Sequence, residues 1–133
     1  MKIRLVTPGG ASAIWPRVED FVKRGCDKSD GELNPFTLKH LVTNGRFGLW
    51  VAEDDSRVRM VAVVKMERWR DGVVARIVTI AGDDMKNFLP MWGDFKQMLK
   101  KRGASWVLLE GRMGWLRVCP DLKLTRIVAM AEL

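Results

Sequence analysis

The sequence predicts one α/β domain in which a mixed, mostly antiparallel central sheet is flanked by helices. Residues 106–109 are apolar at every position, as in strands that are covered on both faces. Residues 48–80 contain three short strand patterns separated by tight turns, which predicts an antiparallel meander. With 133 residues, the chain is long enough for one core and too short for two, so residues 1–133 form a single domain.

The chain is expected to begin with a strand and a helix. Residues 2–6 form the strand, and residues 7–10 form a turn. Ser12 is a candidate N-cap for the helix, and Pro16 fits its first turn. Apolar residues then recur at helical spacing to about Arg24.

A polar loop over residues 25–34 leads to a second helix. This helix starts at Asn34-Pro35 and is ended by Asn44-Gly45. The asparagine supplies a cap and the glycine a stop, so both ends are marked.

Three strands follow, over residues 48–53, 58–67 and 73–80. The Asp71-Gly72 pair between the second and third of them is a strong hairpin signal. Because the connections are short, neighbouring strands in the chain should pair in the sheet.

The third long helix follows a loop over residues 81–86. We place its N-cap at Asn87, because Pro90 then falls in the first turn, where a missing N–H does no harm. A start at Asp84 would place the proline where it breaks a helical bond. Arg102-Gly103 ends the helix.

The last part of the chain predicts a buried strand over 106–109, a short helix over 113–118 and a final strand over 125–130. The order is therefore β-α-α-β-β-β-α-β-α-β. Glu110 and Arg112 follow the buried strand directly. Open α/β sheets keep ligand clefts at such carboxyl ends, so this is a candidate site.

Composition narrows the function classes. The net charge is +7, but the basic residues are scattered, which favours a solvated surface over a nucleic-acid interface.

The two cysteines, Cys26 and Cys119, are far apart, and no signal peptide or membrane span is apparent, so we expect reduced thiols and a cytoplasmic location. The single histidine, His40, and the absence of CxxC spacing give no metal site. The six tryptophans are interpreted as core anchors.

The order of elements resembles the GCN5-related N-acetyltransferase (GNAT) fold. Residues 49–55 resemble the second strand and turn of that family, 58–64 and 74–80 its third and fourth strands, and 113–124 its last helix and the turn after it. The resemblance implies an acetyl-CoA site and acyl transfer to an amine. Residues 110–117 also resemble small acetyltransferase-like proteins of tailed bacteriophages, often encoded near virion assembly genes.

The segment after the fourth strand departs from the family pattern. Active members have a glycine-rich loop there, whose amides and following helix hold the pyrophosphate of coenzyme A. Here one glycine remains and two aspartates stand where the pyrophosphate would arrive. If any coenzyme A binds, the resemblance implies contacts with Gly82, Asp83, Asp84, Met85, Lys86 and Asn87.

The proton-transfer groups also depart from the family. The chain has no tyrosine, the usual general acid, and alignment places Cys119 there. A buried structural cysteine is the competing interpretation. The usual glutamate of the fourth strand is missing, which leaves Glu67 and Glu110 as candidate bases. Each is alternatively a surface charge or an arginine partner, and in the latter case Glu110 is grouped with Arg112 and Arg117 as an ion-pair cluster.

Three hypotheses follow. In the first, the chain is a virion or assembly accessory protein, or a protein-binding module, with a degenerate acetyl-CoA site, no required cofactor and a viral or host protein partner. In the second, it is an acetyl-CoA-dependent N-acetyltransferase acting on an amine of a protein or small molecule. The third, nucleic-acid binding through scattered arginines, is the weakest. An exposed strand edge or tryptophan patch would allow self-association.

Overall fold

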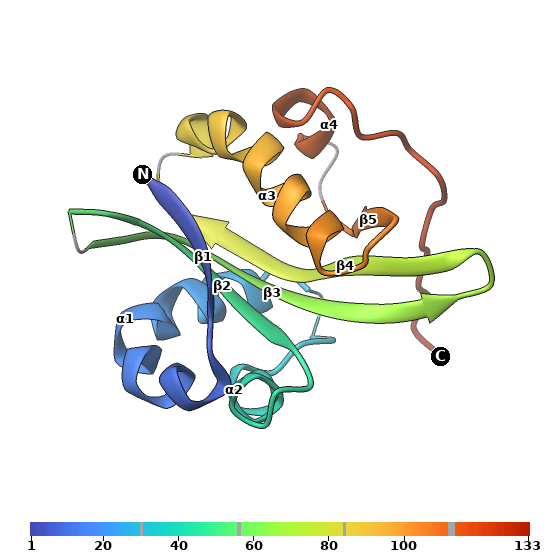
Figure 1. The fold of residues 1–133 in the computed structure, drawn as a ribbon. Coiled ribbons are helices and arrows are strands. Elements are labelled where there is room, and N and C mark those ends of the chain that lie inside the picture. The colour runs from blue at the N-terminus through green and yellow to red at the C-terminus, as the bar shows by residue number, and fades with distance from the viewer. Residues whose placement is uncertain (30, 56, 84, 112–113) are drawn as a thin grey trace.

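A five-stranded sheet carries helices on both of its faces (Figure 1). This computed structural model describes residues 1–29, 31–55, 57–83, 85–111 and 114–133, with the side chain of Met85 left aside. The strands lie in the sheet in chain order, and every pair is antiparallel except β4 and β5, which are parallel. The strands are β1 (Lys2–Val6), β2 (Gly48–Asp54), β3 (Arg57–Trp69), β4 (Gly72–Gly82) and β5 (Trp106–Leu109). The helices are α1 (Pro8–Cys26), α2 (Pro35–Thr43), the 3₁₀ helix η1 (Met85–Asn87), α3 (Leu89–Lys101) and α4 (Trp115–Val118). The predicted fold class is confirmed.

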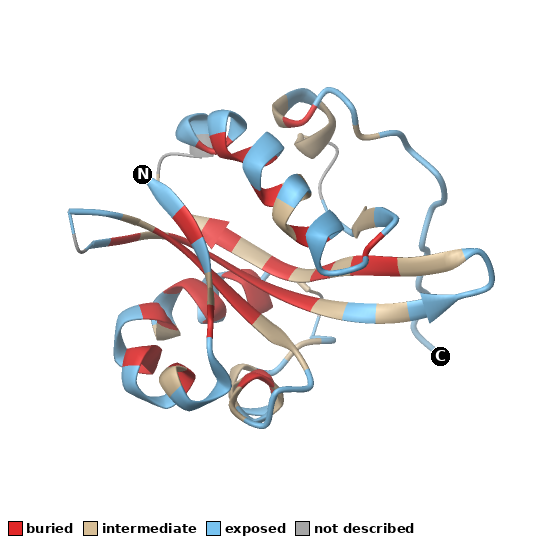
Figure 2. Cartoon of the chain, in the orientation of Figure 1, coloured by how far each residue is buried: buried red, intermediate tan, exposed pale blue. Residues whose placement is uncertain are grey.

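The core has two halves, one on each face of the sheet. Side chains alternate along a strand, so Val61 and Val63 of β3 face α1 and α2 while Ala62 and Val64 face α3. On the α3 side, Trp50 and Phe95 pack edge to face with ring centroids 5.2 Å apart. The buried positions run along the central strands and the inner faces of the helices (Figure 2).

The first helix begins earlier than the sequence suggests. Thr7 has an extended backbone and its hydroxyl accepts a hydrogen bond from the Gly10 amide at 3.0 Å, so it is the N-cap. The expected N-cap at Ser12 is therefore wrong. The Pro-Gly-Gly run, interpreted as a turn, forms the first turn of the helix because proline is well suited to that position. Pro16 consequently lies inside α1.

The second helix and the hairpin follow the prediction closely. The Asn34 side chain accepts hydrogen bonds from the Phe36 amide at 2.8 Å and the Thr37 amide at 3.4 Å, and α2 ends at Thr43. Strands β3 and β4 meet at the predicted Asp71-Gly72 turn, where Trp69 pairs with Gly72. Both strands are longer than predicted.

The start of α3 differs from the prediction. Asn87 belongs to the 3₁₀ helix η1, and Phe88 occupies the N-cap position without a side-chain cap. Phe88 is buried and packs against Trp92, so hydrophobic burial sets the entry to this helix. Pro90 lies in the first turn, as expected.

The structure also corrects the predictions for the last strands of the sheet. Strand β5 has β4 as its only partner in the sheet of described residues, and Trp106 is 50% exposed, so β5 is not buried on both faces. Residues 125–130 form no strand. The short helix α4 starts at Trp115, and residue 113, the first of the predicted helix, lies outside the described residues with residue 112. An apolar run signals burial, but it does not tell a central strand from an edge strand.

Candidate functional site

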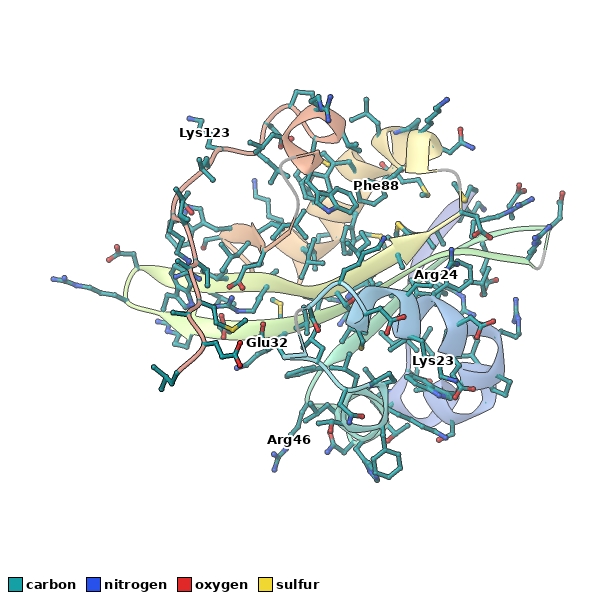
Figure 3. The ribbon with its side chains drawn as sticks, turned by 180° about the vertical axis from the view of Figure 1, so that it is seen from behind. Lys23, Arg24, Glu32, Arg46, Phe88 and Lys123 are labelled. Carbon is teal, nitrogen blue, oxygen red and sulfur yellow. The ribbon has the colours of Figure 1, made fainter. Side chains whose placement is uncertain are left out.

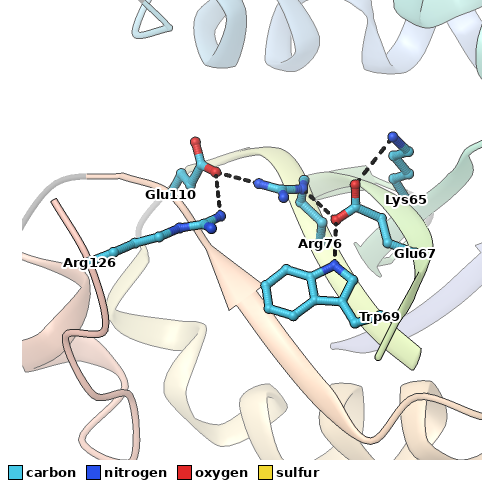
Figure 4. A network of polar contacts seen from close by, with 6 residues as sticks. All are labelled: Lys65, Glu67, Trp69, Arg76, Glu110 and Arg126. Carbon is cyan, nitrogen blue, oxygen red and sulfur yellow. Dashed lines mark hydrogen bonds and ion pairs between the residues drawn. The ribbon is translucent and has the colours of Figure 1, made fainter. Parts of the chain in front are cut away.

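Two of the predicted carboxylates meet at one arginine (Figure 4). Glu67 lies on β3, Arg76 on β4, and Glu110 immediately after β5. The Arg76 Nε donates a hydrogen bond to Glu67 Oε1 at 2.8 Å, and its Nη1 forms an ion pair with Glu110. We call this group, with Lys65, Trp69 and Arg126, the Arg76 network.

Strand register brings these residues together. Lys65 is the Cα partner of Arg76, and Arg76 is the partner of Leu108. Every second side chain of a strand faces the same way. Glu67 follows Lys65 by two residues, and Glu110 follows Leu108 by two, so both glutamates lie on the same face of the sheet as Arg76. This is the face that α1 and α2 cover elsewhere.

Both carboxylates have further donors. Lys65 Nζ lies 3.2 Å from Glu67 Oε2, and the Trp69 indole donates to Glu67 Oε1 at 3.3 Å. Arg126, from the C-terminal segment, lies 3.4 Å from Glu110 Oε1. Glu67 thus contacts three donor side chains, and Glu110 contacts two.

The electrostatics follow from these contacts. Partial burial acts to raise the pKa of Glu67, but hydrogen bonds from Arg76, Lys65 and Trp69 outweigh it and hold that pKa below its usual value. Burial acts to lower the pKa of Arg76, but the hydrogen bond and charge of Glu67, with those of Glu110, raise it. Glu67 and Arg76 are therefore both ionised at neutral pH.

A cavity of about 480 Å³ opens beside Glu67 and Arg76. Its floor is the sheet and its wall is the start of α2 with the loop before it. The lining combines polar and apolar side chains: Glu32, Leu33, Asn34, Thr37, Leu38, Leu41, Phe47, Lys65, Glu67, Arg76 and Val78. The sequence analysis missed this wall, because a polar loop and a helix cap give no signal of which strand they face.

Cys119 lies away from this cavity, on the α3 side of the sheet. It is fully buried, and burial with the nearby charge of Asp121 raises the pKa of its thiol to about 11. Asp121 in turn accepts a hydrogen bond from the Trp92 indole at 2.7 Å and pairs with Lys96, which ties the turn after α4 to α3. The geometry matches a structural cysteine.

The segment 82–88 forms a strand end and a 3₁₀ helix. The Asp83 amide donates to the Arg59 carbonyl at 2.9 Å, and its carboxylate lies 3.2 Å from Arg24 of α1. The amides of Met91 and Trp92 both donate to the Phe88 carbonyl. Figure 3 places Arg24 and Phe88 on opposite sides of the sheet. Lys86 and Asn87 are exposed in the same segment, and Asp84 lies outside the described residues.

Strands β4 and β5 pair over only part of their length. The parallel register joins Val74–Ile77 with Trp106–Leu109, while β4 continues to Gly82. Residues 78–82 therefore extend past the end of β5, next to the start of α3. In the described parts of the chain, no group of three His, Cys, Asp or Glu side chains is placed to hold a metal ion, and no helix is long and apolar enough to cross a membrane.

Comparison with known proteins gives a structural likeness without a sequence match. No protein-family model matches this sequence, and no curated protein matches it either. Among solved structures, an aminoglycoside acetyltransferase from an uncultured soil metagenomic sample, in complex with sisomicin, aligns with a TM-score of 0.71 at 12% identity, covering 99% of this chain and 95% of that one. A protein described as a probable acetyltransferase gives a TM-score of 0.70 at 14% identity, covering 100% and 97%. A possible acetyltransferase from Clostridium difficile 630 gives 0.64 at 14% identity, covering 99% and 97%. The fold is therefore GNAT-like.

Proposed function

We propose that this chain is a binding or assembly protein on a GNAT-like fold, with a degenerate acetyl-CoA site and a protein partner. The observation that carries the proposal is the position of Arg76 between the two candidate bases. A general base must be able to accept a proton from the incoming amine. Glu67 and Glu110 instead accept hydrogen bonds from the same guanidinium, and the pKa of Glu67 is lowered.

The charge of the Arg76 network supports the same conclusion. It contains three cations, Lys65, Arg76 and Arg126, and two carboxylates, so three minus two leaves one net positive charge. Most aliphatic amines are protonated at neutral pH, as the pKa of lysine illustrates. The network therefore has no excess negative charge to attract such an ammonium group, and with Glu32 the charges that line the cavity only cancel.

Part of the backbone at the pyrophosphate end is already engaged. A diphosphate needs several unused amides at a helix start. Here the amides of Asp83, Met91 and Trp92 are already bonded, and Pro90 has none. On the side of the thiol, Cys119 is buried with a raised pKa, so it is a poor proton donor to a leaving thiolate.

Calorimetric titration of the full chain with acetyl-CoA tests this proposal directly. We expect no saturable heat at concentrations up to the millimolar range. Saturable binding of micromolar strength would contradict the degenerate site. Thermal stability in the same buffer verifies that the titrated protein is folded.

The assembly role within this proposal is supported by the resemblance of residues 110–117 to tailed-phage proteins. In this proposed role, the chain acts in the host cytoplasm during assembly and associates with the virion. Mass spectrometry of purified particles and assembly intermediates from the encoding phage tests it. Absence of the chain from both preparations would contradict the assembly role.

The second candidate function is acetyl-CoA-dependent N-acetylation, and one feature favours it. Beyond Ile77, β4 has no β5 partner in the described sheet, so its backbone edge could pair with a ligand, and the cavity beside Glu67 could take a second one. The assay is release of free CoA with a panel of peptides, polyamines and aminoglycosides, the last included because one structural neighbour was solved with sisomicin. Turnover that is lost in Glu67→Gln or Glu110→Gln would establish this function and overturn the first.

A further inference from the structure

The outer end of the β3–β4 hairpin leaves part of one sheet face open. The hairpin extends past α1 and α2, the helices that cover this face elsewhere (Figure 1). Trp69 of β3 pairs with Gly72 and Trp106 of β5 pairs with Val74, two residues further along β4. Both tryptophans therefore lie on the same face as Arg76. Their exposed fractions are 41% and 50%.

Gly72 brings the two indole rings close together. A Cβ built on this glycine would lie 3.0 Å from Cζ3 of Trp106, so the ring of Trp106 occupies the space that a side chain would fill. Trp69 is the partner of the same glycine on the other strand, so the two rings are neighbours across it. Exposed aromatic rings on an open sheet face are the means by which sheet-based domains stack the bases of single strands.

Cations without an ion-pair partner surround this pair of rings. The last turn of α3 leads directly to β5, and the Ser105 amide donates to the Val73 carbonyl at 2.8 Å, so the end of α3 and the hairpin are joined. These two parts of the chain carry five exposed basic residues, and none of the five forms an ion pair with a carboxylate in the described parts of the chain: Arg68, Arg70, Lys100, Lys101 and Arg102.

Most of the net charge of the chain is collected at this end. The same two segments, residues 68–72 and 100–106, contain one carboxylate, Asp71, so five minus one leaves four of the seven net positive charges. The Arg76 network adds one more beside the rings, because the guanidinium of Arg126 lies 5.8 Å from the ring centre of Trp69. Basic residues that are scattered along the sequence are thus gathered by the fold.

We propose that this end of the hairpin binds single-stranded nucleic acid, with Trp69 and Trp106 stacking on bases and the surrounding cations contacting phosphates. Lysine and arginine side chains only donate hydrogen bonds, and phosphate oxygens accept them. Phosphates and base faces are common to DNA and RNA, so the binding is independent of sugar and of sequence. A duplex is a poorer ligand, because its bases are already stacked on one another. An acidic peptide would meet the cations but leave both rings unused.

Fluorescence anisotropy of a labelled oligothymidylate of about 16 nucleotides tests the proposal on the full chain. We expect micromolar binding at about 50 mM salt, and a similar affinity for an oligouridylate of the same length. With about four phosphates contacted and a slope of about −0.7 for each, the affinity should fall about 50-fold between 50 and 200 mM salt. No saturable binding at the lower salt concentration, or tighter binding of a duplex of that length, would overturn the proposal.

Two pairs of variants assign the binding to the rings and to the cations. Trp106→Leu should weaken binding by at least about fivefold, because one stacked base is lost, whereas Trp106→Phe keeps an aromatic face and should remain close to the native protein. Lys100→Gln combined with Lys101→Gln should reduce the salt slope by about 1.4. Lys2→Gln combined with Arg57→Gln is the matched control, since it removes the same charge at the opposite end of β3. Native affinity in Trp106→Leu, or equal losses in the two charge variants, would contradict the proposal.

Competition with polyglutamate separates nucleic acid from an acidic protein partner at the same surface. A polyglutamate of similar length should displace the oligothymidylate only weakly, because it offers charge without bases to stack. Equal potency of the two polymers would show that charge alone determines the affinity, which overturns the proposal. Urea denaturation of each variant verifies that the protein compared is folded.

Discussion

Replacing Arg76 by methionine should destabilise the fold strongly at neutral pH. The Arg76 and Glu67 side chains are 23% and 17% exposed, so removal of the guanidinium leaves a carboxylate in a partly buried place. Breaking a fully buried pair costs about 3–5 kcal/mol, and partial exposure with the remaining bonds from Lys65 and Trp69 reduces this to about 2 kcal/mol.

The cost should depend on pH in a direction set by Glu67. Its pKa in the folded protein lies below the usual value, so its contribution is fully present above the unfolded pKa of about 4.3. That contribution is lost as the pH falls through the lower folded value. Once Glu67 is protonated, loss of Arg76 leaves no unpaired charge there. The destabilisation by Arg76→Met should therefore shrink below about pH 4.

Urea denaturation at pH 7 and at pH 3.5, followed by tryptophan fluorescence, measures both effects. Arg76→Met combined with Glu67→Gln should cost less than the arginine change alone, because no charge is left without its partner. Arg70→Met, in the exposed hairpin turn, is the control for loss of one positive charge. A cost that is equal at both pH values, or strictly additive in the double variant, would refute this account of the Arg76 network.

Three further predictions concern the core. Gly25→Ala should cost about 1–3 kcal/mol, because its added Cβ would lie 1.8 Å from Thr79 Oγ1, and Thr79→Ala in the same chain should recover part of that loss in denaturation curves. Phe95→Ala should cost about 3–5 kcal/mol, since Phe95 is completely buried, and a smaller loss would indicate a loosely packed α3 side. The Cys119 thiol, with a pKa raised to about 11, should resist iodoacetamide at pH 8 until the protein unfolds, as intact mass will show, whereas rapid alkylation of the native protein would reveal an accessible thiol.

The sequence signals that predicted the fold correctly were local ones. Asn34 caps its helix, and the Asp71-Gly72 pair makes its hairpin, because both depend on a few neighbouring residues. Where tertiary packing decides, local signals were insufficient. The start of α3 is governed by burial of Phe88 against Trp92, which no capping rule contains.

The candidate site was predicted in its parts and not in its arrangement. Glu67 and Glu110 were named as the remaining candidate bases once the fourth strand showed no glutamate, and an arginine partner was one of the alternatives. That the two share Arg76 depends on the register of three strands, and that Arg126 joins them depends on the path of the C-terminal segment. Neither is encoded in a short motif. Of the predicted grouping of Glu110 with Arg112 and Arg117, Arg112 lies outside the described residues. The ion pairs of Glu110 among the described residues are with Arg76 of β4 and Arg126 of the C-terminal segment.

The likeness of this protein to acetyltransferases lies in the backbone fold, whereas the side chains at the candidate site have to be judged by themselves. Solved structures at 12% and 14% identity align over nearly the whole chain, so the fold is similar while most side chains differ. A fold of this kind supports many functions, and activity depends on the groups placed in the site. Arg76 is a charged residue of β4, the fourth strand, on which the GNAT resemblance implies a glutamate that serves as base. The same side chain then binds both remaining carboxylates and joins β3, β4 and the residue after β5 into one unit. Arg76 thus acts as a structural clamp between the two carboxylates, and this is the physical ground for our proposal that the chain binds a partner and does not carry out acyl transfer.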